Sequence, residues 1–276
     1  MTRMYPSPFP AEHRQIMVVP SIGTRYSQRN GYIPHLAGAM AGCVRARPGN
    51  YIAFFPSFEY LETARDEIIA YIDQSSCPEG ITTDTQPLNT VEVICQERAM
   101  TPLERARVLN DLRHASNGRS TLILAVQGGI FSEGVDYPGE ALSGVIIIGP
   151  GLPSPSFERA LVHAYFQERY GKGFEYAYLY PGLARVIQAA GRLIRSQDDK
   201  GIILLVGERF ARKRYTAHLP PDWFKNNTHL VLARSGADRR EREPDLLAKQ
   251  VHEQVRRFWN PEDGSVFRMT RPEHNH

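Results

Sequence analysis

A short run near residue 190 joins residue types that bind phosphate. Gln188, Gly191, Arg192 and Arg195 lie three or four residues apart or side by side. On an α-helix these positions fall along one stripe. Arginine stays charged and presents a fork of donors that matches phosphate oxygens, and glycine lets a phosphate approach the backbone closely. The run therefore predicts an anion site, although a core helix whose arginines pair with carboxylates has the same pattern.

The residues around this run predict one helix over residues 181–196. Apolar side chains cover most of its remaining circumference, so we expect the helix to be buried nearly all round except for the arginine strip. These apolar positions are Leu183, Val186, Ile187, Ala189, Ala190, Leu193 and Ile194.

The string QAAGRLIR, with Asp199 after it, resembles motif VI of superfamily 2 helicases, specifically of the DinG/XPD family of DNA helicases. In that family the two motif arginines reach the triphosphate in a cleft between two RecA-like domains. The resemblance implies that Arg192 and Arg195 stabilise charge on the γ-phosphate of ATP. It also implies that Gln188 orients the nucleotide or water and that Gly191 contacts the nucleotide.

Strand-like and helix-like segments alternate ahead of this run. Short apolar, β-rich runs end in turn residues and give way to helical spacing, which is typical of a parallel sheet with helices on both faces. We therefore predict an α/β fold, which the resemblance narrows to a RecA-like helicase C-terminal domain. The main predicted strands are 51–55, 91–95, 121–126, 144–149 and 202–206, and the helices before the run are 32–47, 58–72, 101–114 and 156–170.

Residues 127–136, QGGIFSEGVD, directly follow a predicted strand. Glycines there let backbone amides approach a ligand, and the carboxyl edge of a parallel sheet is where such folds bind ligands. A glycine-rich turn without function is the alternative. FSEGVD resembles motif V of the same family, which implies nucleotide binding by Gly134 and Asp136 and DNA contacts from Ser132 and Glu133. From the residues alone, Asp136 could pair with an arginine or with the ribose.

Two further segments are candidates for DNA contact. Ser57 follows a predicted strand and can cap the next helix, whose N-terminus offers free N–H groups to a phosphate. FFPSFEYLE resembles motif IV of the family, in which this turn touches the DNA backbone. Arg25 and Arg29 lie in TRYSQR, which resembles the segment that enters the second motor domain, and a solvated basic loop is the alternative.

Composition narrows the class of protein only partly. The chain of 276 residues is 42% hydrophobic and carries a net charge of +3, which permits a nucleic-acid partner without requiring one. Cys43, Cys77 and Cys95 lie outside any CxxC spacing, so neither a metal nor an iron–sulfur site is predicted. No signal-peptide pattern and no membrane-spanning apolar run is visible, so we expect a cytoplasmic protein without a membrane partner.

The family resemblance divides the chain into three parts. It covers about residues 16–225 as the RecA-like domain, after an irregular lead-in at 1–15 and before a charged, partly helical extension at 226–276. Within that extension, residues 246–259 predict a helix, which we expect to be a solvated amphipathic tail. Docking of this helix on a partner domain is the alternative.

A complete DinG/XPD motor also needs a Walker A loop for the phosphates and an acidic motif for magnesium, and this sequence contains neither. The resemblance therefore implies the second motor domain of an ATP-dependent DNA helicase, inactive without an N-terminal motor domain that holds the Mg²⁺ of Mg²⁺-ATP. Single-stranded DNA is the other expected partner. A stand-alone nucleic-acid-binding or regulatory module with a RecA-like fold and no catalysis is the alternative.

Overall fold

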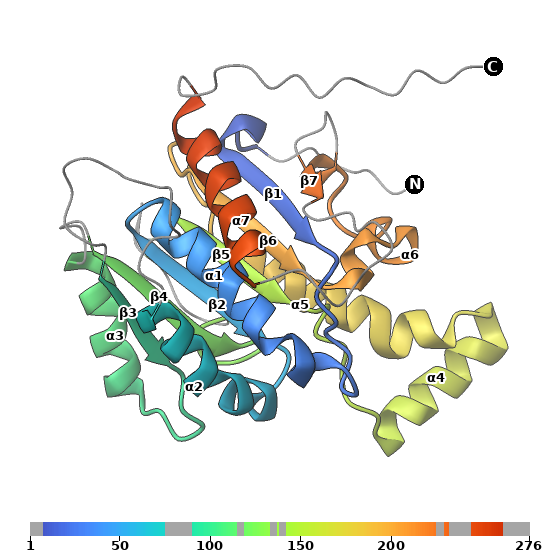
Figure 1. The fold of residues 1–276 in the computed structure, drawn as a ribbon. Helices are drawn as coiled ribbons and strands as arrows, with labels where there is room; N and C mark the ends of the chain where they lie inside the picture. The colour runs from blue at the N-terminus through green and yellow to red at the C-terminus, as the bar shows by residue number, and fades with distance from the viewer. Residues whose placement is uncertain are drawn as a thin grey trace, which may run out of the picture.

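A computed structural model gives the fold of residues 8–74, 90–114, 119–132, 137, 142–224, 229–231 and 244–261. Its centre is a sheet of seven strands in the order β3-β4-β2-β5-β6-β1-β7, and all neighbouring strands run parallel (Figure 1). The strands are β1 Arg14–Val19, β2 Asn50–Phe55, β3 Val91–Cys95, β4 Ser120–Val126, β5 Gly144–Ile148, β6 Gly201–Val206 and β7 His229–Val231.

The central strands are buried on both faces. Every residue of β2, β4, β5 and β6 is buried. This burial explains why their sequences are nearly continuous apolar runs instead of alternating patterns. The predicted parallel α/β sheet is confirmed.

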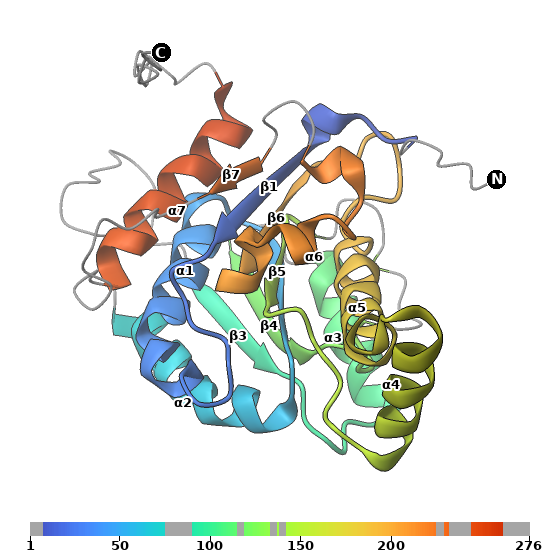
Figure 2. The same ribbon diagram turned by 90° about the vertical axis from the view of Figure 1, so that its right-hand side faces the viewer.

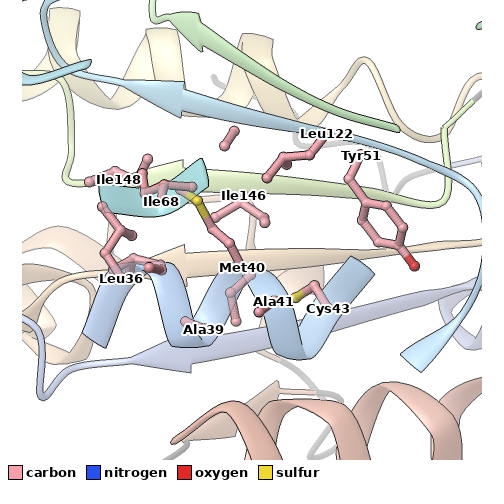
Figure 3. Close-up of a cluster of buried hydrophobic side chains, with 14 of the residues drawn as sticks. Leu36, Ala39, Met40, Ala41, Cys43, Tyr51, Ile68, Leu122, Ile146 and Ile148 are labelled. Atoms are coloured by element: carbon pink, nitrogen blue, oxygen red, sulfur yellow. The ribbon is translucent and has the colours of Figure 1, made fainter. Parts of the chain in front are cut away.

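Two layers of helices cover the sheet. One face packs against α1 Ile33–Ala46, α2 Phe58–Gln74 and α7 Pro244–Trp259, and the other against α3 Pro102–His114 and α5 Tyr180–Ala190 (Figures 1 and 2). Successive strand residues alternate between these two cores, as the pleat of a strand requires. Figure 3 shows the first core, where Leu36 and Met40 of α1 meet Ile146 and Ile148 of β5.

Between β5 and β6 the chain leaves the sheet and returns. Helix α4, Phe157–Tyr170, projects from the body of the molecule (Figure 2). It begins at Ser156, whose hydroxyl oxygen accepts a 3.2 Å hydrogen bond from the N–H of Arg159, and it ends at Gly171 in the left-handed conformation. A π-helical turn, Glu175–Leu179, then runs directly into α5. The remaining short elements are η1 Ala11–His13, η2 Arg29–Tyr32, η5 Glu208–Ala211, α6 Lys213–Thr216 and η6 Pro221–Trp223.

The C-terminal helix α7 is part of the folded body. Its residues Leu247, Ala248, Val251 and Val255 are buried against α1. The expectation that this helix is a solvated tail was wrong. An amphipathic pattern predicts an apolar stripe on the helix, but it does not say what covers the stripe.

Candidate nucleotide and nucleic-acid interface

The predicted site residues fall in two groups. One group lies at the carboxyl edge of the sheet, and the motif VI residues lie in the turn that leads into the amino end of β6. Strands β4, β5 and β6 end in the turns that begin at Gln127, Gly149 and Gly207. Such an edge is where open parallel sheets bind ligands, because the loops that leave the strands converge there.

Gln127 joins two of these turns. Its side chain is buried, and its Nε2 donates hydrogen bonds to the carbonyl oxygens of Ile148 at 3.2 Å and Gly149 at 3.1 Å. A Cβ at Gly151 would lie 1.9 Å from Gln127 Oε1, and Gly151 has φ of +58°, so only glycine fits this position. The sequence analysis treated Gln127 only as the start of a glycine-rich turn. Its place directly after a buried strand is the signal that could have identified it.

Helix α5 ends earlier than the sequence predicted. The expected helix ran to Ser196, but α5 ends at Ala190. The backbone N–H groups of Arg192 and Leu193 donate to carbonyls three residues earlier, which tightens the chain into a turn. The helix-wheel stripe predicted for Arg192 and Arg195 therefore does not apply to them.

Asp199 explains why the helix stops. Its carboxylate, which is buried, accepts hydrogen bonds of 2.7 Å from the backbone N–H groups of both Arg195 and Ser196. The hydroxyl oxygen of Ser196 accepts in return from the N–H of Asp199 at 3.2 Å. These bonds replace the backbone partners that a continued helix would have supplied, and Gly191 lowers the helical preference just before them.

The helix is also less buried than predicted. Ile187, expected in the core, is 36% exposed, and Gln188 beside it is exposed. Leu183, Val186 and Ala189 point into the core, as predicted. Gln188 and Gly191 are thus accessible on the surface of the α5 end, where the resemblance requires a nucleotide contact.

Arg192 is held against the turn that follows β4. Its Nε donates a 2.9 Å hydrogen bond to the carbonyl oxygen of Ser132. The predicted motif V and motif VI segments are therefore in direct contact in this structure, although about 60 residues separate them. Both Arg192 and Arg195 are half-buried.

A further arginine, Arg185 of α5, lies over the carboxyl edge. Its Nη1 is 3.5 Å from the carbonyl oxygen of Gly151, and its Nε lies 3.5 Å from the position that a Cβ of Gly128 would take. Arg185 therefore spans the turns after β4 and β5. Its guanidinium places hydrogen-bond donors at the carboxyl edge.

Tyr137 is a member of the site that sequence reasoning missed. Its ring is buried, its hydroxyl donates 2.9 Å to the carbonyl of Phe131, and the guanidinium carbon of Arg195 lies 6.0 Å from the ring centroid. Burial raises the pKa of Tyr137, and the positive charges of Arg192, Arg195 and Arg105 act against that rise.

Ser132 does not offer its side chain to DNA in this conformation. Its hydroxyl is buried and donates 2.9 Å to the carbonyl oxygen of Gly129. The backbone carbonyl of Ser132 is the acceptor for Arg192, and a DNA contact from Ser132 stays a prediction. Glu133, Gly134 and Asp136 lie outside the described residues.

Ser57 caps α2, as the residue type predicts. Its hydroxyl oxygen accepts a 3.3 Å hydrogen bond from the N–H of Tyr60. Arg25, in the turn after β1, pairs with Glu208 at 2.7 Å and keeps 45% of its side chain exposed. Both residues lie just beyond the carboxyl ends of strands, whereas the motif VI turn leads into the amino end of β6.

Arg29 differs from Arg25 in its surroundings. It is 7% exposed and pairs with Glu59 at 2.8 Å, so it is not part of a solvated basic loop. Its guanidinium carbon lies 4.4 Å from the ring centroid of Tyr26 and 4.8 Å from that of Tyr60. A phosphate contact from Arg29, as predicted, would require this arrangement to open.

The described residues show neither a group of metal ligands nor a membrane-spanning helix. Within these ranges, no three or more His, Cys, Asp or Glu side chains group as metal ligands. No helix in the part of the chain that the structure describes is both long and apolar enough to cross a membrane.

The model of the helicase C-terminal domain family matches residues 40–227. The chain belongs to this family. It is 26% identical over 201 residues to the helicase subunit XPD/RAD3 of general transcription and DNA repair factor IIH of Saccharomyces cerevisiae, covering 70% of this chain and 24% of that protein. It is 34% identical over 118 residues to the ATP-dependent DNA helicase DinG of Photobacterium profundum, covering 41% of this chain and 16% of that one. The predicted resemblance to DinG/XPD helicases is confirmed.

A third relative agrees with this assignment, and a solved structure matches the fold. The helicase C-terminal domain is 27% identical over 233 residues to the ATP-dependent DNA helicase CHL1 of Coccidioides immitis, covering 77% of this chain and 26% of that protein. A solved XPD helicase matches its fold with a TM-score of 0.55 at 18% identity, covering 79% of this chain and 35% of the other. The chain spans about a quarter of the length of XPD/RAD3 and CHL1.

Proposed function

We propose that this helicase C-terminal domain is the second motor domain of an ATP-dependent DNA helicase and completes an ATP site whose first half lies on a companion motor domain. The observation that carries the proposal is the contact between Arg192, in the turn before β6, and Ser132, in the segment after β4. It joins the motif VI turn to the motif V turn, the two segments through which the family connects nucleotide and DNA.

The donor set fits a triphosphate. Arg185 presents its guanidinium at the turns after β4 and β5, and Arg192 and Arg195 present theirs beside Ser132 and Tyr137 in the segment that follows β4. Phosphate oxygens accept hydrogen bonds and carry negative charge, so a guanidinium fork binds them in two places at once. We assign Mg²⁺ to the companion domain, together with the Walker A loop and the acidic motif.

In the proposed reaction, Arg192 and Arg195 stabilise the charge that develops on the γ-phosphate while water attacks it. Gln188, exposed at the end of α5, orients the water or the nucleotide, and Gly191 gives the phosphates close access to the backbone. Tyr137 beneath Arg195 and the carbonyl of Ser132 beside Arg192 fix where the two guanidiniums lie. Fixed donors cost no reorganisation when the charge appears.

The proposal extends to the DNA. Gly134 and Asp136 belong to the segment that would transmit the state of the nucleotide, and Glu133 would contact the strand. We place the phosphates of single-stranded DNA along the Ser57 turn and Arg25, because the N-terminus of α2 and a half-exposed guanidinium both favour an anion. Binding of this kind weakens as salt rises.

Hydrolysis of ATP tests the proposal. The chain alone should turn over no ATP, with or without single-stranded DNA, whereas the motor assembled with its companion domain should show DNA-stimulated hydrolysis. In that assembly, Arg192→Ala should lower turnover by roughly 10³- to 10⁵-fold, the effect of removing an arginine finger.

Arg169→Ala is the matched control, because Arg169 is exposed and its guanidinium donates to the hydroxyl of Tyr165 on the same helix, α4. It should leave turnover near that of the wild type. Near-normal turnover in Arg192→Ala would contradict the arginine-finger role. Salt-sensitive DNA binding without hydrolysis in any assembly would favour a non-catalytic nucleic-acid-binding module instead.

A further inference from the structure

Tyr26 is a tyrosine whose side chain lies mostly in solvent at the carboxyl edge of β1. It is 74% exposed, among the most exposed large hydrophobic side chains of the described residues. The backbone N–H groups of Gln28 and Arg29 both donate 2.9 Å hydrogen bonds to the carbonyl oxygen of Arg25. These two bonds close one helical turn, which fixes the backbone from which the Tyr26 ring projects.

The ring of Tyr26 is supported by a cation that cannot move freely. The guanidinium of Arg29 lies 4.4 Å from its centroid and 4.8 Å from the centroid of the buried Tyr60. Glu59 holds the same guanidinium at 2.8 Å, and the hydroxyl of Tyr60 donates 3.2 Å to the carbonyl oxygen of Arg29. Because Arg29 is almost wholly buried, the support is rigid.

An exposed aromatic ring on a rigid base suits a flat ligand. Nucleic-acid bases stack on aromatic side chains irrespective of their sequence, because every base has a π-face. A ring that is already ordered loses little conformational freedom when a base stacks on it. The cation beneath the ring also favours the polyanionic backbone that a base brings with it.

The position of Tyr26 agrees with such a ligand. Tyr60, which packs against the same guanidinium, donates its backbone N–H to the cap residue Ser57. The ring of Tyr26 and the N-terminus of α2 are therefore parts of one corner of the molecule. A strand whose phosphates follow the Ser57 turn would carry its bases past this corner.

We propose that Tyr26 stacks on an unpaired base of single-stranded nucleic acid bound along the carboxyl edge of the sheet. The inference rests on the proposed nucleic-acid binding and adds to it the residue that contacts a base. It also gives Arg29 a place beneath the ring instead of on a phosphate.

The test compares two strands that differ only in their bases. Fluorescence anisotropy measures binding of the full chain to an oligothymidylate of about 15 nucleotides and to an abasic strand of equal length. Tyr26→Ala should weaken oligothymidylate binding by roughly 5- to 100-fold, the range for one lost base–aromatic stack. It should leave abasic-strand binding and the slope of affinity against salt unchanged, because no phosphate contact is lost.

Two variants sharpen the result. Tyr26→Phe keeps the ring and should bind oligothymidylate like the wild type. Tyr165→Ala removes an exposed tyrosine on α4 and should also bind like the wild type. Unchanged oligothymidylate binding by Tyr26→Ala would overturn the inference, and so would an equal loss for the abasic strand, which would point to a phosphate or folding effect.

A different set of binding results would show that the proposed function itself is wrong. If the wild-type chain bound neither strand at low salt, nucleic-acid binding itself would be rejected, and the stacking role with it. If Tyr26→Ala abolished binding of a protein partner while leaving both strands bound as before, the corner would be a protein-docking site and the stacking role would be wrong.

Discussion

Helices α4 and α7 are both amphipathic, but they lie on opposite sides of the molecule and differ in what covers them (Figure 2). Helix α7 buries Leu247, Val251 and Val255 against α1. Helix α4 buries no residue, and its Phe157 is 75% exposed. Both helices carry apolar residues, but α7 packs into the core and α4 projects from the body of the molecule.

The difference originates on α1 and not on either helix. A Cβ at Gly38 would lie 2.4 Å from the carbonyl oxygen of Pro244, and one at Gly42 would lie 2.5 Å from that of Ala248. The two glycines let α7 approach so closely that backbone meets backbone. Arg47 also lies over the ring of Trp259 at 3.8 Å, which fixes the far end of α7.

Helix α4 has a narrower attachment. Its Phe166 ring stacks on Tyr176 with centroids 4.0 Å apart, and Arg159 donates 3.3 Å to the carbonyl of Ala177. These contacts join α4 only to the π-helical turn ahead of α5. The comparison shows that an apolar stripe becomes core only where another element offers a surface without side chains in the way.

The largest loss of stability is expected from placing a side chain on the glycine surface of α1 that α7 covers. Gly42→Val would place methyl groups where the backbone of Ala248 and the side chain of Val251 now lie. We expect the free energy of unfolding to fall by about 3 kcal/mol, the upper part of the range for overpacking. Urea unfolding measures this loss, and hydrogen exchange would show faster exchange in α7.

Gly31→Val is the matched control for this change. Nothing lies within 4 Å of a Cβ at Gly31, and the residue is exposed. Its unfolding free energy should stay within about 0.5 kcal/mol of the wild type. An equal loss in both variants would mean that the close approach of α7 is not what Gly42 provides.

Truncating one apolar side chain on each helix should have a smaller effect on stability, and the loss should be greater on α7 than on α4. Val251→Ala on α7 removes a fully buried side chain and should cost about 1–2 kcal/mol of unfolding free energy. Leu161→Ala on α4, at a position 55% exposed, should cost less than about 0.5 kcal/mol. Thermal or urea unfolding of both variants checks the contrast, and equal losses would contradict it.

The sequence was sufficient to predict the main strands of the sheet, but not to predict that α7 is buried and α4 is not. Strands β2, β4, β5 and β6 are nearly continuous apolar runs, which can be predicted as strands from their own residues. The docking of α7 depends on Gly38 and Gly42, which lie about 200 residues before it, and no local pattern links them.

The candidate site could also be predicted only in part. Motif residues such as Arg192 and Ser57 were identified from their strings; Arg192 contacts the predicted motif V segment, and Ser57 caps α2 at the carboxyl edge. The end of α5 was not predictable from helical spacing, because Asp199 terminates it through bonds to the backbone. The burial of Arg29 depends likewise on Glu59, a residue distant in sequence.

The smallest expected effect is a pH dependence of the α7 contact. His252 of α7 is partly buried, and its Nε2 has no hydrogen-bond partner among the described residues. Burial lowers the pKa of His252, and the nearby charges of Arg256 on α7 and Arg45 on α1 lower it further. The unfolded chain therefore takes up this proton more readily than the folded chain, so the contribution of the neutral side chain to stability is lost as pH falls below about 6.5.

Between about pH 7.5 and 5.5, the wild type should lose more unfolding free energy than His252→Gln, in which this group does not titrate. Urea unfolding at both pH values measures the difference, and identical pH dependence in the two proteins would contradict the role of His252, since the other histidines contribute equally to both.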